Sequence, residues 1–389
     1  MKFNYYMPTK LLFGKGQLEN LHKQELPGKK ALIVISSGKS TRKFGYLDRL
    51  INQLELSGVE YVLFDKVLPN PIKGHVMEGA KLAKDNSCDF VIGLGGGSSM
   101  DTAKSIAVMV TNGGDYWDYI HGGTGKCKAI ENDPLPIVAI TTTAGTGTEV
   151  DPWTVITNEN TNEKIGFGYD KTFPVIAIVD PDLMMSVPQM LTAFQGFDAL
   201  FHSTEGYINN TAYIMSDMFA LKAIELVGKS LEAVVKNGDN EEARADVALA
   251  NTLSGFVEST SGCISKHSIE HALSAFHPGL THGAGLIMIS EAYYTHIAES
   301  GACDARMIDM AKALGKKDAD KAMDFVDALS ELIRGCGVDN LKMSDFGIDE
   351  NELDKYAINA RETMGGLFDF DPTVINHEHI VSILKKSFK

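Results

Sequence analysis

Short apolar runs alternate with amphipathic stretches along the first half of the chain. Five runs have the length and β-branched composition of strands, namely residues 31–36, 61–65, 89–94, 136–141 and 174–179. They are apolar almost throughout, which is typical of parallel strands covered on both faces. Segments 46–56 and 76–84, between the first three runs, are amphipathic and suit helices. The alternation predicts an α/β dinucleotide-binding domain over residues 1–185, with a doubly wound, mainly parallel sheet.

The pattern changes at about residue 189, where long amphipathic segments with helical periodicity replace the strand-like runs. Six of them are helix candidates: 192–208, 215–235, 241–259, 321–334, 350–364 and 378–386. Glycine and asparagine stand at the breaks, where helices commonly end. A second, all-α domain over residues 186–389, which would bind a metal, is therefore predicted.

Four of the eleven histidines lie within sixteen residues, at His267, His271, His277 and His282. Upstream, Asp198 and His202 are four residues apart in a predicted helix and so share one of its faces. Any one of these histidines could simply be packed or exposed. The cluster together with the Asp/His pair favours a site for a divalent metal such as Fe(II), Zn(II) or Mn(II), which imidazole and carboxylate bind without cysteine.

A glycine turn, GLGGGSSMDTAK at 93–104, joins the third predicted strand to a helix. Glycines let a ligand approach the backbone, and the free N–H groups of a helix N-terminus suit a phosphate. The spacing departs from G-x-G-x-x-G because Ser98 takes the sixth position. An ordinary turn is the alternative, but the carboxyl end of a strand in mid-sheet favours pyrophosphate binding.

A second loop, SSGKSTRK at 36–43, follows the first predicted strand. It is not a Walker A loop, because Ile33 stands where the first glycine is needed. It lacks an acidic residue to bind a ribose 2′-hydroxyl, whereas it offers Lys39, Ser40 and Arg42, which suit a 2′-phosphate. Gly38, Lys39 and Ser40 are the predicted cofactor contacts in this loop. A solvated basic turn is the alternative; the loop favours NADP(H) over NAD(H).

Charge and composition narrow the function classes. The net charge of −15 argues against a nucleic-acid partner, which would require a basic surface. The sequence has no run of eighteen apolar residues, so no membrane span is predicted. The N-terminus lacks the apolar region of a signal peptide. Five scattered cysteines without a C-x-x-C motif fit a reducing compartment. A cytoplasmic protein is expected.

Taken in order, these motifs resemble those of the iron-dependent (group III) alcohol dehydrogenases. LLFGKG near the start, LPNP at 68–71, the glycine turn, TTAGTGTE, HSIEHAL…THG and the tail FDFDPTVINHEHIVSIL all occur in the family's order. The resemblance covers nearly the whole chain. It implies the dehydroquinate-synthase-like architecture and a homodimer.

The resemblance also implies roles for individual residues. Metal ligands would be Asp198, His202, His267 and His282, around Fe(II) with Zn(II) or Mn(II) as alternatives. His271 would lie near the nicotinamide as a proton shuttle, with packing as the alternative. Because the interval from His267 to His282 is slightly longer than usual for the family, His277 is an alternative fourth ligand. The pyrophosphate would be held by Gly95, Gly96, Gly97, Ser98 and Asp101, and further cofactor contacts would come from Asn70, Thr142, Thr143, Thr146, Lys164 and Leu183.

These residues predict a metal-dependent oxidoreductase that interconverts a small primary alcohol or diol and its aldehyde by hydride transfer with NAD(P)(H). A divalent cation lowers the pKa of a bound oxygen or polarises a carbonyl, as this reaction needs. The alternative is a dehydroquinate-synthase-like lyase acting on a polar sugar acid. That enzyme needs several basic residues beside the metal, and Lys266 is the only one between residues 259 and 291. A non-catalytic binding protein with the same fold would not be expected to keep the full ligand set.

Overall fold

The computed structural model describes residues 2–388, which form two compact units. The sheet unit comprises residues 6–143 and 148–186, and the helical unit comprises 2–5, 144–147 and 187–388. The predicted boundary after residue 185 lies one residue before the division seen here. The short segments 2–5 and 144–147 belong to the helical unit because of long-range contacts that a local hydrophobic pattern does not record.

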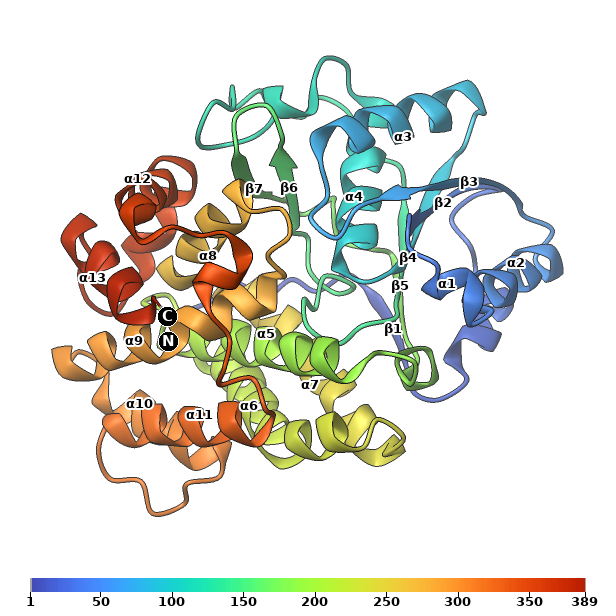
Figure 1. Ribbon diagram of the computed structural model, residues 1–389. Helices are drawn as coiled ribbons and strands as arrows, with labels where there is room; N and C mark the ends of the chain where they lie inside the picture. Colours follow the sequence, from blue (N-terminus) through green and yellow to red (C-terminus); the bar gives the residue numbers. More distant parts are fainter. Residues whose placement is uncertain (1, 389) are drawn as a thin grey trace. The chain divides into compact units, whose positions relative to one another are not determined.

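A six-stranded parallel sheet forms the centre of the sheet unit, in the order β1-β8-β5-β4-β2-β3 (Figure 1). The strands are β1 (Lys10–Phe13), β2 (Lys30–Ser36), β3 (Glu60–Val67), β4 (Phe90–Gly95), β5 (Ile137–Thr141) and β8 (Ile176–Val179). The predicted fold class is confirmed. The four-residue edge strand β1 and the separate antiparallel hairpin of β6 (Thr154–Asn158) and β7 (Glu163–Phe167) were not predicted.

Helices cover both faces of this sheet. They are α1 (Ser40–Lys43), α2 (Tyr46–Leu56), α3 (Lys73–Asp85) and α4 (Gly97–Thr111). Ile92 of β4 lies in the same apolar core cluster as Leu47 and Leu50 of α2. The next residue, Gly93, faces α4, since a Cβ there would lie 2.9 Å from the Cα of Met100. Successive strand residues point to opposite faces, so α2 and α4 lie on opposite sides.

The helical unit consists of α-helices joined by turns and short 3-10 helices. Its helices are α5 (Gln189–Ile208), α6 (Ile214–Lys236), α7 (Glu241–Thr260), α8 (Ser265–Phe276), α9 (His282–Ser300), α10 (Asp304–Leu314), α11 (Met323–Gly335), α12 (Leu353–Met364) and α13 (His377–Ser387). The six helices expected from the sequence are present, with ends within three residues of the predictions. Helix α9 escaped prediction because much of its circumference is buried, so it has no strong polar stripe.

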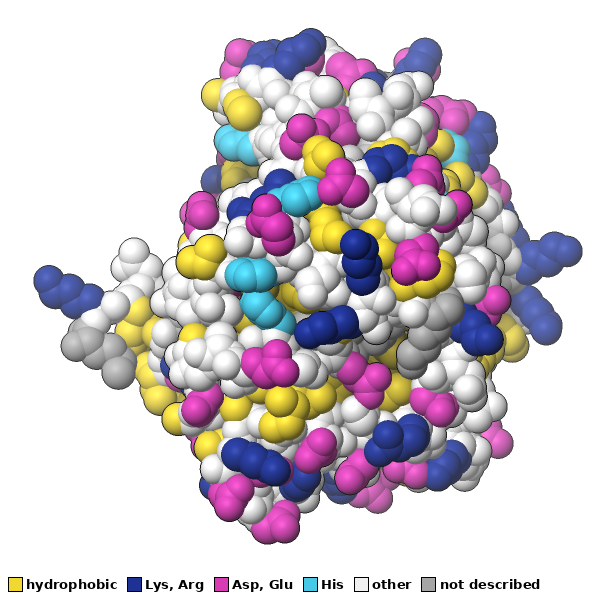
Figure 2. Space-filling model, turned by 60° about the vertical axis from the view of Figure 1, so that its left-hand side comes forward, with side chains coloured by type: hydrophobic (Ala, Val, Ile, Leu, Met, Phe, Trp, Pro, Cys, Tyr) yellow, Lys and Arg dark blue, Asp and Glu magenta, His cyan; other side chains and the backbone are white. Residues whose placement is uncertain are grey.

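Within residues 2–388, no helix combines the length and apolar character needed to cross a membrane. On the face shown in Figure 2, acidic and basic side chains are interspersed. The chain as a whole is acidic, so an anionic cofactor must be bound by local groups.

Candidate active site

The candidate metal site begins on helix α5. Asp198, His202 and Glu205 are spaced four and three residues apart, so they lie along one face of the helix. All three side chains are buried. Helix α8 contributes His267, and His282 is the first residue of α9. Segments distant in sequence therefore meet within the helical unit.

One carboxylate oxygen, Asp198 Oδ1, is the common point of the site. It lies 3.7 Å from Nε2 of His202, 3.6 Å from Nε2 of His267 and 3.5 Å from Nε2 of His282. Donors that share an ion at about 2.0–2.2 Å are themselves roughly 3–4 Å apart. The structure thus brings together all four predicted metal ligands.

The other ring nitrogen of each imidazole faces an acceptor. Nδ1 of His202 lies 3.2 Å from the carbonyl oxygen of Gly145, and Nδ1 of His267 lies 2.8 Å from Oε1 of Glu205. Nδ1 of His282 is hydrogen-bonded to Oε2 of Glu270. A carbonyl or carboxylate accepts only, so Nδ1 donates in each case and the lone pair of the neutral ring is at Nε2.

Two atoms at the centre of this arrangement are left without the partners that burial normally demands. Asp198 Oδ1 and His267 Nε2 are buried, and neither has a hydrogen-bond partner among the described residues. A buried polar atom without a partner is costly. The donor set fits a divalent cation, which would satisfy both atoms.

Of the two remaining histidines of the cluster, His271 lies beside His282 and His277 is bonded elsewhere. The His271 ring is 5.2 Å from the His282 ring and 6.2 Å from the His267 ring, and its Nδ1 lies 3.0 Å from the sulfur of Met364. Nε2 of His277 is bonded to the Tyr356 hydroxyl at 2.7 Å. The geometry therefore favours His282 over His277 as the fourth donor, the choice that the sequence left open.

In the sheet unit, several of the predicted cofactor residues follow the carboxyl ends of neighbouring parallel strands. Gly95 ends β4 beside Thr141 at the end of β5, and the Thr142 N–H donates to the Gly95 carbonyl at 2.9 Å. A Cβ at Gly96 would lie 3.1 Å from the Thr143 side chain, so the two turns approach each other closely and a larger residue would crowd Thr143. Helix α4 starts after Gly96 without a side-chain cap, which leaves N–H groups for a ligand.

The loop after β2 lies at the same end of the sheet, because β2 and β4 are parallel neighbours and their carboxyl ends lie side by side. Gly38, Lys39 and Ser40 are exposed there. Arg42 forms an ion pair of 2.5 Å with Asp65 of the neighbouring strand β3. An acidic residue thus approaches this basic loop from another strand, a contact that the loop's own sequence does not reveal.

Three predicted cofactor residues lie in other settings. Both oxygens of Asp101 accept from protein donors, the Thr148 hydroxyl at 2.8 Å and the Val155 N–H at 2.9 Å. Burial raises the pKa of this carboxyl to about 6. Leu183 is fully buried in the apolar core of the sheet unit, and its contact with the cofactor stays a prediction. Thr146 belongs to the helical unit.

Comparison with known proteins gives the same family as the motifs. A family model described as iron-containing alcohol dehydrogenase matches residues 8–181, and the C-terminal model of the Fe-containing alcohol dehydrogenase family matches 192–388. The chain belongs to the iron-containing alcohol dehydrogenase family. The predicted resemblance is confirmed.

Individual members of the iron-containing alcohol dehydrogenases are similar to the chain along its whole length. Alcohol dehydrogenase 4 of Schizosaccharomyces pombe is 33% identical over 386 residues, which cover 98% of this chain and 88% of the relative. The probable NADH-dependent butanol dehydrogenase 1 of Bacillus subtilis is 31% identical, with 99% of each chain covered. The crystal structure of an archaeal halo-thermophilic Red Sea brine pool alcohol dehydrogenase superposes with a TM-score of 0.95 at 34% identity, covering 100% of this chain and 99% of that one.

Three polar residues next to the four proposed metal donors were not predicted to belong to the site: Cys263, Lys266 and Glu270. Glu270 on α8 holds His282, and Cys263 Sγ lies 3.1 Å from Nδ1 of His267. Lys266 is fully buried, with Nζ 3.6 Å from Oε1 of Glu205 and 3.3 Å from the centre of the Phe201 ring. The i,i+3 spacing of His267 and Glu270 was the one available signal, since it places both on one helix face.

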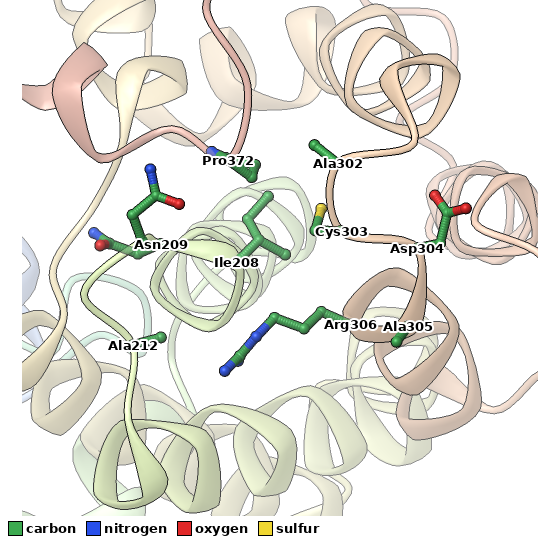
Figure 3. Close-up of a pocket in the computed structure, with 10 residues that line it drawn as sticks. Ile208, Asn209, Ala212, Ala302, Cys303, Asp304, Ala305, Arg306 and Pro372 are labelled. Atoms are coloured by element: carbon green, nitrogen blue, oxygen red, sulfur yellow. The ribbon is translucent and has the colours of Figure 1, made fainter. Parts of the chain in front are cut away.

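A separate pocket of about 390 Å³ lies in the helical unit, where α5 ends and α10 begins (Figure 3). It is lined by residues that include Ile208, Asn209, Ala212, Cys303, Arg306 and Pro372. Arg306 is already paired with Asp217 at 2.7 Å and packs on the Tyr207 ring. None of the predicted site residues lines this pocket. The Arg306 guanidinium is already paired with a carboxylate, so it is not a free charge for an anionic ligand.

Metal affinity is expected to rise with pH. Although burial disfavours a charged imidazole, the Glu205 carboxylate bonded to its Nδ1 and the nearby Asp198 carboxylate raise the pKa of His267 to about 9. Below that pH the ion must displace a proton, so affinity should rise by about tenfold per pH unit for each proton released. Titration with Co(II) at pH 6.5 and pH 8.5 measures this change, and equal affinities would contradict the protonation assigned to His267.

Proposed function

We propose that the chain interconverts a small primary alcohol or diol and its aldehyde by hydride transfer to and from a nicotinamide dinucleotide, at a divalent metal ion. The observation that carries this proposal is the convergence of three imidazole Nε2 atoms to within 3.7 Å of Asp198 Oδ1. Fe(II) suits this donor set, and Zn(II) and Mn(II) suit it as well. When bound, the ion acts as a Lewis acid that polarises the substrate oxygen.

The protein groups around the four donors fix their direction. Gly145, Glu205 and Glu270 accept from the three Nδ1–H groups, so each Nε2 keeps its lone pair for the ion. Burial disfavours the charged form of Asp198, but the neighbouring imidazoles of His202, His282 and His267 lower the pKa of its carboxyl well below the usual range. The carboxylate therefore stays ionised at working pH.

His271 is the residue proposed to move the hydroxyl proton. The Met364 sulfur beside its Nδ1 can accept but cannot donate, which places the ring proton at Nδ1. Nε2 of the neutral ring is then available as a base, and histidine is the side chain that most readily exchanges a proton near neutral pH.

The cofactor proposal uses the carboxyl edge of the parallel sheet. Gly95, Gly96, Gly97 and Ser98 would receive the pyrophosphate at the start of α4, supported by Thr142 and Thr143. Asp101 supports the adjacent β6 segment through its bonds to Thr148 and Val155. Nζ of Lys164 lies 3.4 Å from Oδ1 of Asn70, which keeps both as candidate contacts.

The preference for NADP(H) over NAD(H) stays a prediction. Exposed Lys39 and Ser40 support it, whereas the Arg42–Asp65 ion pair places a carboxylate beside the same loop. Wild-type kcat/KM should be higher with NADPH than with NADH. Lys39→Ala should reduce that ratio by on the order of tenfold through loss of a charge-assisted contact.

The control for Lys39→Ala is Lys43→Ala, which removes a lysine three positions after Ser40. It should leave the cofactor ratio unchanged. A wild-type enzyme that prefers NADH would refute the reading of this loop.

The lyase alternative requires basic side chains that a polar acid substrate can reach. Lys266, the one basic residue in the histidine segment, is fully buried against Phe201 and faces Glu205. It cannot meet an anionic substrate without unfolding that region, so the lyase is not favoured.

The direct test of the proposed function is NADPH and NADH oxidation with a series of short aldehydes. Protein stripped of metal should be inactive, and Fe(II), Zn(II) or Mn(II) should restore turnover. Full activity in metal-free protein would contradict the proposal.

We also propose a homodimer in a reducing, cytoplasmic compartment. Phe3 packs on Tyr213, with Ile214 and Met218 nearby on α6, and these apolar side chains are 44–59% exposed apart from Tyr213. Exposed apolar groups gathered in this way suit an interface. Sedimentation of wild type and of Met218→Glu tests the dimer, which the variant should weaken.

All five cysteines are free thiols, which supports the proposed reducing compartment.

A further inference from the structure

Glu270 is a buried carboxylate that is hydrogen-bonded to one of the four proposed metal ligands, His282. It lies on α8, one turn after His267, and its side chain is fully buried. Its Oε2 accepts from Nδ1 of His282. The sequence motifs gave Glu270 no role.

His282 is the ligand that most needs such support. Its side chain is 22% exposed, against 9% for His202, 6% for Asp198 and 3% for His267. The other three ligands lie within helices, whereas His282 is the first residue of α9 and follows a turn. The first residues of a helix lack the intrahelical N–H bonds of its interior, so their backbone is less constrained.

The packing of α8 and α9 makes room for the Glu270 carboxylate. A Cβ at position 285 would lie 2.8 Å from both Cγ and Oε1 of Glu270. Helix α9 can pack against the Glu270 side chain because residue 285 is a glycine and has no Cβ. A Cβ at Gly283 would lie 2.2 Å from the carbonyl oxygen of Phe194 on α5. The two glycines bring the start of α9 against both helices that carry the other ligands.

We propose that Glu270 is a positioning residue that holds the His282 ring with Nε2 directed at Asp198 Oδ1, and that it thereby sets how long the metal is retained. The inference rests on the proposed function, because it assumes that the four donors bind an ion. A carboxylate partner fixes the ring's tautomer and orientation and makes the ligand nitrogen more basic. Loss of such a partner typically costs about 10- to 100-fold in metal affinity.

The test uses Co(II), whose visible absorption reports the geometry of its ligands, in the full-length chain. Wild type, Glu270→Gln and Glu270→Leu are loaded with Co(II), and its release to an excess of chelator is followed. Glu270→Leu should release the ion roughly 10- to 100-fold faster than wild type and change the visible spectrum. Glu270→Gln keeps an acceptor oxygen without the charge, so its release rate should lie between the two.

Glu352→Gln is the matched control, because Glu352 also supports a histidine of this segment, through the Tyr356 hydroxyl at 3.0 Å and His277. It should release Co(II) at the wild-type rate. Should Glu270→Leu fail to fold, Glu270→Gln carries the test, and a wild-type release rate and spectrum in that folded variant would overturn the role of Glu270. A wild-type protein that binds no Co(II) would overturn the proposed function itself.

Discussion

Replacing His267 with alanine is expected to lower bound metal and turnover together, each by at least on the order of 100-fold, while the fold is retained. His267 lies within 3.6 Å of Asp198 Oδ1 and supplies one of four donors. Its loss should exceed the cost of removing a residue that only supports a ligand, which is about 10- to 100-fold. Metal analysis and kcat/KM for aldehyde reduction, measured on the same preparation, check the result.

The control is His277→Ala, at the end of the same helix. His277 bonds to Tyr356 and lies outside the four donors, so this variant should keep its metal and most of its activity. Circular dichroism of both variants should match wild type. Normal turnover in His267→Ala would remove His267 from the ligand set.

Lys104→Met is expected to lower the free energy of unfolding by roughly 3–5 kcal/mol, the cost of breaking a buried ion pair from one side. The Lys104 side chain is fully buried, and its Nζ lies 3.1 Å from Oδ1 of Asp151. It also donates to the Thr148 hydroxyl at 2.6 Å and to the Trp153 carbonyl at 2.8 Å. Methionine fills similar space but leaves these acceptors without their cation. Urea unfolding measures the change.

Lys81→Met provides the comparison for this stability effect. Lys81 is on the exposed surface of α3 and pairs with Asp85 four residues on, so its loss should cost less than about 1 kcal/mol. A similarly small effect for Lys104→Met would mean that the Lys104 contacts do not stabilise the sheet unit.

The elements with a clear period could be predicted from the sequence. Helix α2 begins and ends at the predicted residues 46 and 56, and β2 and β5 differ from the predicted strands by a single residue at one end. The two strands lie inside the sheet and are buried along nearly their whole length, which their continuous apolar runs indicate. The hairpin β6–β7 was missed because it follows a loop rich in threonine and glycine, whose composition also suits an ordinary turn.

The convergence of the four proposed metal donors could be predicted from the sequence, but the groups around them could not. Asp198 and His202 share a helix face, and the family resemblance supplied His267 and His282. The partners that fix each Nδ1 come from other elements, as with Glu270 for His282 and Gly145 for His202. Such pairings depend on how helices pack, which residue spacing along a single segment does not determine.

Burial adds two features to the sequence-based picture. Leu183, a predicted cofactor contact, packs in the core of the sheet unit. The sequence suggested one carboxylate at the metal, whereas Glu205 and Glu270 add two buried carboxylates beside it and Lys266 adds one buried cation. The electrostatic balance of the site therefore depends on residues that do not touch the ion.

The most direct test is anomalous X-ray diffraction from crystals of the protein loaded with Fe(II). We predict a single strong peak about 2.0–2.2 Å from Asp198 Oδ1 and from Nε2 of His202, His267 and His282. A peak elsewhere in the chain, or a loaded crystal with no peak at these four atoms, would contradict this prediction.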